Sequence, residues 1–522
     1  MFLVAVFLQR AGGAYRSEFG GHPDEAAHYV TGLMVHDYLT GGLPGAPMGY
    51  AKRYYDHYPK VALGNWPPGF YLLQTAWTAV FSPSRSSVLV LMAALTAGIA
   101  TILFILIRGY FGWVYGLIGA AAFVAFPLTQ RHTAMVMTEV PITLLALISI
   151  CCFARYVARE RAFDAVLFAL FASAAIMTKG SGLFLALLPP LAILFTRKFH
   201  LLKRRALWCS AAIVVLLCFP WTYRFREEAR AGWMEASPSV HFMREAAVFY
   251  PERLILGVGF AVAVLAAIGL CVRSRRESGE SESSAWSVFA AALLALLLFH
   301  ATVPCGLEDR HLLPALPLVI LFAVSGVEAV SRPFGVRSAR AVGGVAMALT
   351  IVASIWQVGC VPHKGYQGFS PVAQELVKDS ANGNATFLIS SDARGEGMFV
   401  SEVAMLDNRP GHVVRRASKL LASSTWSGEA YKAQYSFRNS RGEEEKREYK
   451  NEDDLERLLL QDTIDFVIVD TSVPDTKRVK HHEMLRRTVE KFPAVFVPCG
   501  RYPIQREGAW MDAIFVYRIK RN

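Results

Sequence analysis

The chain is 522 residues long, with 53% hydrophobic and only 18% charged side chains, a composition that excludes an ordinary soluble protein of this length. Its formal net charge of +12 suits either nucleic-acid binding or a membrane protein, and the placement of the basic residues decides between them. We therefore expect a mainly α-helical polytopic membrane protein with a small soluble domain at its C-terminal end.

Residues 1–86 form the first predicted part, a stub followed by a large loop. The first eight residues are apolar but too short to cross a bilayer alone, so they either continue as a short first span or belong to a longer segment. Apolar side chains at three- and four-residue spacing predict an amphipathic surface helix over Asp24–Leu39, with Asp24 at its N-cap. Pro67–Phe81 predicts an interfacial or partly buried helix.

Residues 87–361 form the predicted transmembrane core. Its apolar runs are long enough, some with flanking residues, to cross about 30 Å of hydrocarbon, and with the stub they predict about eleven transmembrane helices. The runs are Val88–Ile107, Gly112–Leu128, Val140–Phe153, Ala165–Met177, Gly182–Phe195, Ala206–Tyr223, Leu254–Val272, Ala285–Val303, Leu312–Val327 and Ala341–Val361.

The basic residues gather in alternate loops of this core, which is the pattern of charges that fixes membrane orientation. The rich loops hold Arg155, Arg159 and Arg161; Arg197, Lys198, Lys203, Arg204 and Arg205; Arg273, Arg275 and Arg276; and Arg332, Arg337 and Arg340. The intervening short loops hold one basic residue each, namely Arg131, Lys179 and Arg310. We therefore expect no nucleic-acid partner, an inner or plasma membrane location, and a first loop and C-terminal region on the external side.

Residues 362–522 are predicted to form an external α/β domain, because short strand and helix signals alternate there. The expected strands are Thr386–Ser390, Asp465–Asp470, Val495–Val497 and Ile514–Ile519, and the expected helices are Glu452–Leu460 and His482–Lys491. The turn Ser391–Gly397 follows a strand and opens a helix. It is interpreted as an ordinary tight turn in preference to a phosphate-binding loop.

Ionisable side chains gather at the predicted outer ends of the spans, and few lie at midspan, where an ion pathway would need them. The outer set comprises His22, Asp24, Glu25, His28, Lys60, Glu139, Lys179, Glu308, Asp309 and Arg310. A carboxylate can act as general base on an acceptor hydroxyl, and a cation can bind the phosphate of a lipid-linked sugar. This distribution favours a reaction on a lipid-borne substrate at the outer interface.

Five segments, taken in order, resemble the GT-C integral-membrane glycosyltransferases, in particular the family 39 and family 83 branch. That branch contains protein O-mannosyltransferases and lipid A aminoarabinose transferases. The resemblance covers roughly residues 20–330. It rests on Pro23-Asp-Glu-Ala-Ala-His-Tyr29, Trp66-Pro-Pro-Gly-Phe-Tyr-Leu-Leu73, Met137-Thr-Glu-Val-Pro141, Thr178-Lys-Gly180 and Arg310-His-Leu-Leu-Pro-Ala-Leu-Pro317.

The resemblance implies Asp24 as the catalytic residue, with Glu25 beside it and Glu139 as a second acidic residue, where relatives usually have Asp. Aminoarabinose transferases carry Lys before the Pro-Pro pair, but this chain has Trp66 there. Donor phosphate would then be bound by a cation elsewhere, while Trp66 and Tyr71 either belong to an interfacial aromatic belt or line the sugar site. The implied substrate-binding residues are Lys60, Trp66, Tyr71, Lys179 and Arg310.

The family uses polyprenyl- or dolichyl-phosphate sugars and generally inverts the anomeric centre. The resemblance therefore implies transfer of a hexosyl or pentosyl group to an unspecified protein, lipid or glycan acceptor, without a cofactor or catalytic metal. A transporter or flippase of lipid-linked sugars is the main alternative, and an assembly subunit is a third. A transporter would show inverted repeats and polar midspan residues, and neither is evident in the sequence.

Overall fold

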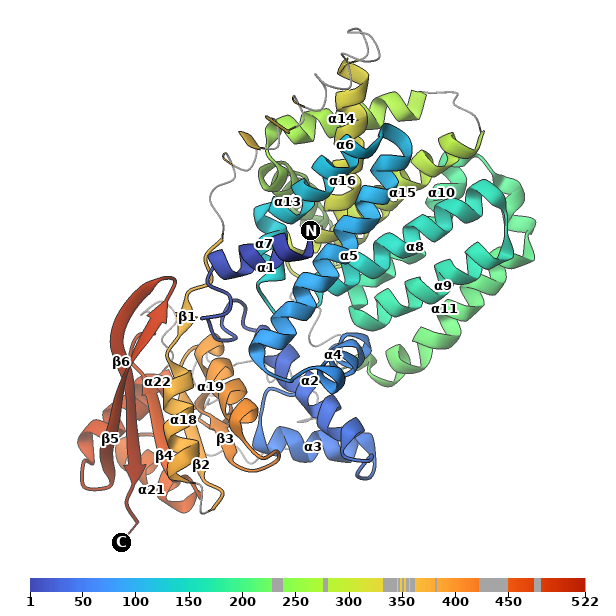
Figure 1. The fold of residues 1–522 in the computed structure, drawn as a ribbon. Coiled ribbons are helices and arrows are strands. Elements are labelled where there is room, and N and C mark those ends of the chain that lie inside the picture. Colours follow the sequence, from blue (N-terminus) through green and yellow to red (C-terminus); the bar gives the residue numbers. More distant parts are fainter. Residues whose placement is uncertain are drawn as a thin grey trace.

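The computed structural model describes residues 1–227, 238–275, 280–331, 362–380, 383–421, 449–473 and 480–521, with a few isolated positions between 345 and 356. It consists of a helical half and a smaller sheet-containing half, joined by the loop that carries α2, α3 and α4 (Figure 1). The predicted span over 341–361 lies outside the described residues, apart from those isolated positions.

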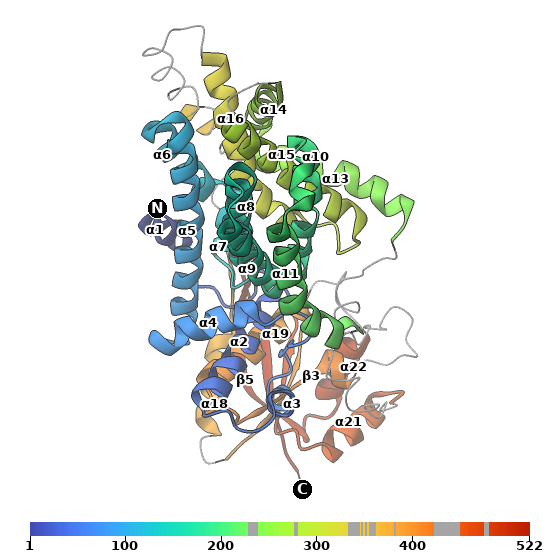
Figure 2. The same ribbon diagram turned by 90° about the vertical axis from the view of Figure 1, so that its right-hand side faces the viewer.

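The helices that precede the sheet-containing half belong to the helical half, except α2, α3 and α4 of the joining loop, and α5, α8 and α9 run roughly side by side (Figure 2). Their bounds are α1 Phe2–Ala11, α2 Glu25–Thr40, α3 Pro47–His57, α4 Gly69–Val80, α5 Arg85–Phe111, α6 Trp113–Ala125, α7 Pro127–Thr133, α8 Glu139–Arg159, α9 Ala162–Thr178, η1 Gly180–Ala186, α10 Leu188–Thr196, η2 Phe199–Lys203, α11 Arg205–Arg224, α13 Val240–Val258, α14 Phe260–Arg275, α15 Glu280–Thr302, η3 Asp309–Ala315 and α16 Leu316–Ser331.

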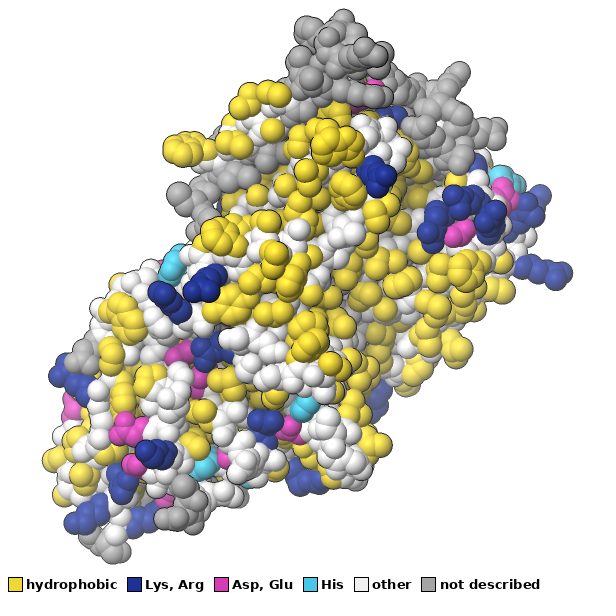
Figure 3. All heavy atoms as spheres, viewed as in Figure 1, with side chains coloured by type: hydrophobic (Ala, Val, Ile, Leu, Met, Phe, Trp, Pro, Cys, Tyr) yellow, Lys and Arg dark blue, Asp and Glu magenta, His cyan; other side chains and the backbone are white. Residues whose placement is uncertain are grey.

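By length and composition, five described segments could cross a membrane: Arg85–Phe111, Glu139–Arg159, Arg205–Arg224, Ser283–Thr302 and Asp309–Ser331. Two bent pairs, α6 with α7 at 61° and α13 with α14 at 112°, raise the number to seven. Three apolar segments are shorter: Phe2–Ala11, Ala162–Thr178 and Gly180–Thr196. The chain is thus a multi-pass membrane protein, and apolar side chains cover much of the helical half (Figure 3).

One predicted span differs in form from the structure. The run Leu254–Val272 was expected to be a single helix, but the chain bends sharply at Gly259, which separates α13 from α14. Gly259 has a φ of 83°, a left-handed conformation that glycine adopts without steric cost. An apolar run carries no signal for such a bend when both of its halves are equally hydrophobic.

The two ends of the helical bundle carry different charges. At one end the α8–α9 and α10–α11 connections meet, because Glu160 pairs with Arg204 at 2.5 Å and with His200 at 2.7 Å. Arg273 of α14 stacks its guanidinium 5.1 Å from the ring centre of Phe111, the last residue of α5. Of the loops predicted to be cytoplasmic, those after α8 and α10 therefore lie together, opposite the end that carries the sheet-containing half, which we call the domain end.

Residues 366–519 form a six-stranded mixed sheet in the order β1-β5-β6-β4-β2-β3, in which β2 is parallel to β3 and β4. The strands are β1 Tyr366–Gln367, β2 Thr386–Ser390, β3 Val413–Arg416, β4 Phe466–Asp470, β5 Phe496–Arg506 and β6 Ala509–Ile519. The helices are α18 Phe369–Asp379, α19 Ala393–Leu406, α20 Ala417–Leu420, α21 Glu452–Gln461 and α22 Lys480–Lys491. The predicted α/β domain is confirmed.

The sheet-containing half packs against the first loop through α19 and α2, which lie side by side in Figures 1 and 2. A side chain at Gly397 of α19 would approach Ala26 and Lys60 to within 3.1 Å, so glycine permits this contact. Helix α2 was expected to lie on the membrane surface. The structure instead buries its residues Glu25–Met34, because α4 covers one side and α19 another.

Candidate functional site

Asp24 occupies the N-cap position of α2, as predicted, but its side chain makes no capping hydrogen bond. Its backbone already has helical angles, φ −86° and ψ −15°, so the carboxylate is not directed at the first-turn N–H groups. Its Oδ2 instead lies 3.5 Å from Arg310 Nη1 and 3.5 Å from His22 Nδ1. The capping interpretation therefore does not account for this carboxylate, which keeps 24% of its surface exposed.

Electrostatics keep Asp24 ionised. Burial alone would raise its pKa, but the nearby His22 and Arg310, with smaller contributions from His28 and Lys60, outweigh burial and hold the pKa below its usual value. A carboxylate at this position is therefore charged at neutral pH, can accept a proton from a neutral hydroxyl and can stabilise positive charge.

Glu139 begins α8 and forms a buried ion pair with Lys179, which follows the last residue of α9. Lys179 Nζ lies 2.8 Å from Glu139 Oε1, and the two side chains are 13% and 2% exposed. Glu139 Oε2 is buried without a hydrogen-bond partner among the described residues. Two predicted site residues from separate spans therefore meet, and one carboxylate oxygen remains able to accept a further hydrogen bond.

Arg310 joins the two acidic positions. Its Nε lies 3.7 Å from Glu139 Oε1 and 2.7 Å from Glu308 Oε2, its Nη1 reaches Asp24, and its Nη2 donates to Glu308 Oε1 at 2.9 Å. The guanidinium is 15% exposed. Segments that begin α2, α8 and η3 thus meet at the domain end around a single arginine. This cluster is Asp24, Glu139, Lys179 and Arg310, and we call it the acidic–basic cluster.

Trp66 and Tyr71 lie together against His28, one helical turn after Asp24. Tyr71 Oη is 3.1 Å from His28 Nδ1, and the rings of Trp66 and His28 have centroids 4.4 Å apart. Burial lowers the pKa of His28 to about 4, despite the opposing effect of Asp24, so this imidazole is neutral. Gly69, at the start of α4, allows that helix to approach the end of α9, because a Cβ there would lie 2.6 Å from the carbonyl oxygen of Met177.

Lys60 lies near Asp24 but is turned toward α19. Its Nζ donates to the carbonyl oxygens of Pro23 and Ala393, each at 3.3 Å. Burial, followed by repulsion from Arg416, lowers the pKa of Lys60 to about 7, and Asp24 only partly offsets this. These contacts favour a role in joining the first loop to the C-terminal domain.

Glu25 is fully buried and has several partners. Its Oε1 accepts from Val136 N at 3.1 Å and pairs with Lys364 Nζ at 2.5 Å, while its Oε2 accepts from Gly21 N at 2.9 Å. The structure therefore places this predicted catalytic residue in a contact that holds the first loop, the α7–α8 connection and the start of the C-terminal domain together.

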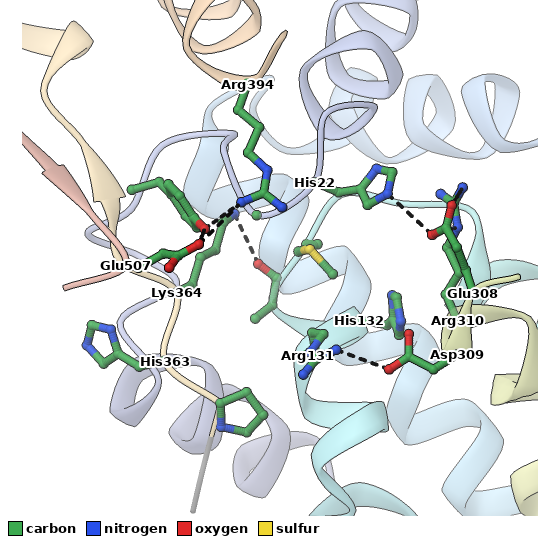
Figure 4. Close-up of a pocket in the computed structure, with 15 residues that line it drawn as sticks. His22, Arg131, His132, Glu308, Asp309, Arg310, His363, Lys364, Arg394 and Glu507 are labelled. Carbon is green, nitrogen blue, oxygen red and sulfur yellow. Dashed lines mark hydrogen bonds and ion pairs between the residues drawn. The ribbon is translucent and has the colours of Figure 1, made fainter. Parts of the chain in front are cut away.

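A cavity of about 460 Å³ opens beside the acidic–basic cluster, between the helical half and the C-terminal domain (Figure 4). Arg131, Arg310 and Glu308 line it on the helical side, and Arg394 and Glu507 line it on the opposite side. Asp24 does not line the cavity, but its two contacts His22 and Arg310 do. The cavity wall carries four cations, Arg131, Arg310, Lys364 and Arg394, together with the carboxylates Glu308, Asp309 and Glu507, and each cation is paired with a carboxylate.

Three residues of this site were given no role from the sequence: His22 and Glu308 were named only in the outer ionisable set, and Lys364 was not singled out. Glu308 shares Arg310, His22 contacts Asp24, and Lys364 neutralises Glu25. The spacing of His28, four residues after Asp24, was a usable signal, since it places both on one face of a helix. Nothing in the sequence indicated that Lys364 would pair with Glu25, because the two residues are separated by 339 positions.

A family model described as dolichyl-phosphate-mannose-protein mannosyltransferase matches residues 65–223. This region contains Trp66, Tyr71, Glu139 and Lys179. A comparison with curated protein sequences found no match.

The fold resembles solved structures along nearly its whole length. ArnT from Cupriavidus metallidurans bound to undecaprenyl phosphate superposes with a TM-score of 0.61 at 11% identity, covering 99% of this chain and 97% of that one. Its apo state gives 0.59 at 12% identity, covering 99% and 96%.

The archaeal oligosaccharyltransferase AglB from Archaeoglobus fulgidus, in complex with an inhibitory peptide and a dolichol-phosphate, gives a TM-score of 0.53 at 12% identity, covering 98% of this chain and 74% of that one. Likeness at such low identity shows the fold. The arrangement of helices and the C-terminal α/β domain identify the chain as a multi-pass membrane protein with the fold of the GT-C glycosyltransferases.

Proposed function

We propose that this protein is a glycosyltransferase that moves a sugar from a polyprenyl-phosphate-linked donor to an acceptor at the outer face of the membrane. The observation that carries the proposal is the partly exposed, ionised Asp24 held by Arg310 beside Glu139 and Lys179. The crystal structures with undecaprenyl phosphate and with dolichol-phosphate support a lipid phosphate as the ligand of this fold.

In the proposed reaction, Asp24 accepts the proton of the acceptor hydroxyl as the acceptor oxygen attacks the anomeric carbon. The bond between that carbon and the phosphate oxygen breaks, and the leaving group departs as lipid phosphate. Negative charge near the sugar ring stabilises the oxocarbenium-like transition state, by analogy with glycoside hydrolysis. We propose this step without a catalytic metal, as the resemblance implies.

The phosphate of the donor would bind in the cavity at Arg310, where it would compete with Glu308 for the guanidinium. Arg310 lines the cavity and also contacts Asp24, so it can hold the leaving group next to the base. A guanidinium suits phosphate because its planar donors form two parallel hydrogen bonds. Lys179 stays paired with Glu139 and would orient that carboxylate toward the sugar.

The direct test is sugar transfer by the purified full-length protein in detergent, with polyprenyl-phosphate sugars as donors. Comparing glycans and glycoproteins of the cell envelope by mass spectrometry, with and without the gene, would identify the sugar and the acceptor. Formation of a new glycosidic bond with release of lipid phosphate supports the proposal. A flippase would move the donor across the bilayer and leave its sugar–phosphate bond intact, which would contradict it.

The proposed orientation places the acidic–basic cluster outside and the arginine-rich connections inside. A reporter fused at Lys203, in the connection that contacts Glu160 through Arg204, should therefore give a cytoplasmic signal. The measurement is a paired alkaline phosphatase and fluorescent-protein fusion. An external signal at Lys203 would reverse the orientation and place Asp24 on the cytoplasmic side.

The pH dependence distinguishes two roles for Lys60. With a pKa of about 7, Lys60 loses its charge as pH rises through neutrality. If its charge bound the donor phosphate, kcat/KM for the donor would fall about tenfold per pH unit above that value. Because Lys60 Nζ is held by two backbone carbonyls, we expect a flat profile between about pH 6 and 9 in the wild type. A decline of kcat/KM above pH 7 in the wild type that is absent in Lys60→Arg would instead support phosphate binding by Lys60.

A further inference from the structure

Two histidines and a cysteine meet at the domain end, next to the segment that carries Arg310. His300 lies in the last turn of α15, Cys305 in the connection that follows, and His311 in η3. One possible ligand atom from each residue lies within 4.8 Å of the others. Both histidines are buried, at 2% and 5% exposure, so the donor atoms converge away from bulk solvent.

The surrounding contacts orient these side chains. Tyr250 of α13 donates its hydroxyl proton to the carbonyl oxygen of Gly306 at 3.0 Å, so its oxygen can accept from His311 Nδ1 at 3.1 Å. This hydrogen bond fixes the tautomer of His311 that leaves a lone pair on Nε2, as an outer partner does for a metal-binding histidine.

The other two possible donors are His300 and Cys305. His300 stacks parallel to His311, with ring centroids 4.7 Å apart and planes within 5° of each other. Cys305 Sγ lies 3.4 Å from His300 Nδ1. An ordinary hydrogen bond between thiol and imidazole explains that single distance, but it does not explain why a possible ligand atom of a second imidazole also lies within 4.8 Å of both.

We propose that His300, Cys305 and His311 form a site for a borderline or soft transition-metal ion, with Zn²⁺ as its simplest occupant. Imidazole nitrogen and thiolate sulfur are the donors that Zn²⁺ selects, at about 2.0 Å and 2.3 Å. A tetrahedral ion at those distances separates its ligand atoms by about 3.5 Å. Binding requires the two imidazoles to turn out of their parallel stack, because a ligand lone pair lies in its ring plane, and requires the ligand atoms to approach from their present separations of up to 4.8 Å. The thiol releases its proton to solvent on binding.

The location indicates what the ion does. Its ligands bracket residues 300–311, the segment that ends α15 and presents Glu308 and Arg310 to the acidic–basic cluster. An ion held there stabilises this segment and touches neither Asp24 nor the cavity, whose lining residues include none of its three ligands. The site is therefore structural. It is compatible with a transfer reaction that needs no catalytic metal. Zinc binding can therefore be tested without measuring sugar transfer, and failure of one proposal leaves the other unaffected.

The test measures metal binding directly. The full-length protein in detergent is stripped with a chelator, incubated with ZnCl₂, desalted and analysed by mass spectrometry for metal content. We expect about one zinc per chain in the wild type and nearly none in Cys305→Ser or His300→Ala. Cys209→Ser and Cys499→Ser, which remove exposed cysteines elsewhere, are matched controls and should bind like the wild type.

Cobalt and heat supply readouts that do not depend on activity. Co²⁺ should give a thiolate charge-transfer band in the wild type and in Cys209→Ser, but none in Cys305→Ser. Zinc should raise the unfolding temperature of the wild type and of Cys209→Ser, but not that of Cys305→Ser. If Cys305→Ser does not fold, His300→Gln takes its place. The proposal is overturned if the wild type retains no zinc, or if folded Cys305→Ser retains as much as the wild type.

Discussion

Replacing Asp24 with Asn should lower the rate of sugar transfer by about 10²–10⁴-fold, the usual contribution of a positioned general base. Asparagine has nearly the same shape, so the N-terminus of α2 keeps its packing, and no capping hydrogen bond is lost because Asp24 makes none. The neutral amide cannot accept the proton of the acceptor hydroxyl. The measurement is release of lipid phosphate in a single turnover, together with size-exclusion behaviour to verify folding.

Two further variants make the result specific. Asp24→Glu keeps the charge but moves the carboxylate by one methylene, so it should retain part of the activity. Asp453→Asn removes an exposed carboxylate on α21, at the far side of the C-terminal domain, and should leave turnover unchanged. Full activity in folded Asp24→Asn would remove Asp24 from the mechanism and with it the main support for the proposed reaction.

The same assay distinguishes the proposed general base, Asp24, from the proposed phosphate-binding residue, Arg310. Arg310 touches Asp24 and also lines the cavity, so its loss affects both proton transfer and binding of the lipid phosphate. Asp24 does not line the cavity, and its substitution should change kcat much more than the KM for the donor. The structure therefore assigns different kinetic signatures to two residues whose charged groups are 3.5 Å apart.

Much of the fold was predictable because local patterns agree with the final structure. Strand β2 has the predicted bounds Thr386–Ser390, and α21 has the predicted start at Glu452, since both are set by short-range hydrophobic periodicity. The bend at Gly259 and the burial of α2 were not predictable, because they depend on what packs against a segment. The apolar face of α2 was visible in the sequence, but its second cover, α19, lies more than 360 residues away.

The candidate site was likewise predictable from the sequence only in part. Motifs beside span ends selected Asp24, Glu139, Lys179 and Arg310, and the structure brings all four together. Trp66 and Tyr71 meet at His28, beside this cluster. Lys60 and Glu25 were selected by proximity in sequence, yet each faces the C-terminal domain. Adjacent positions at the start of a helix point about 100° apart, so neighbours in sequence such as Asp24 and Glu25 need not share a task.

Removing one partner of the Glu25–Lys364 pair should destabilise the protein by about 3–5 kcal/mol, because the other charge remains buried without compensation. The side chains are 0% and 4% exposed, and their charged atoms are 2.5 Å apart. Glu25→Gln leaves the ammonium of Lys364 uncompensated, and Lys364→Met leaves the carboxylate of Glu25 uncompensated. The measurement is thermal or denaturant unfolding in detergent, with limited proteolysis to detect release of the C-terminal domain.

The double variant Glu25→Gln with Lys364→Met tests whether the pair acts as a unit. It should lose less stability than the sum of the two single variants, since no unpaired charge remains. Asp453→Asn breaks an exposed pair with Lys491 and should cost about 1 kcal/mol or less. A catalytic Glu25 would behave differently: Glu25→Gln would abolish turnover at normal stability, and Lys364→Met could not rescue it. Recovery of both folding and turnover in the double variant would establish that Glu25 holds the first loop against the C-terminal domain and leaves the chemistry to Asp24.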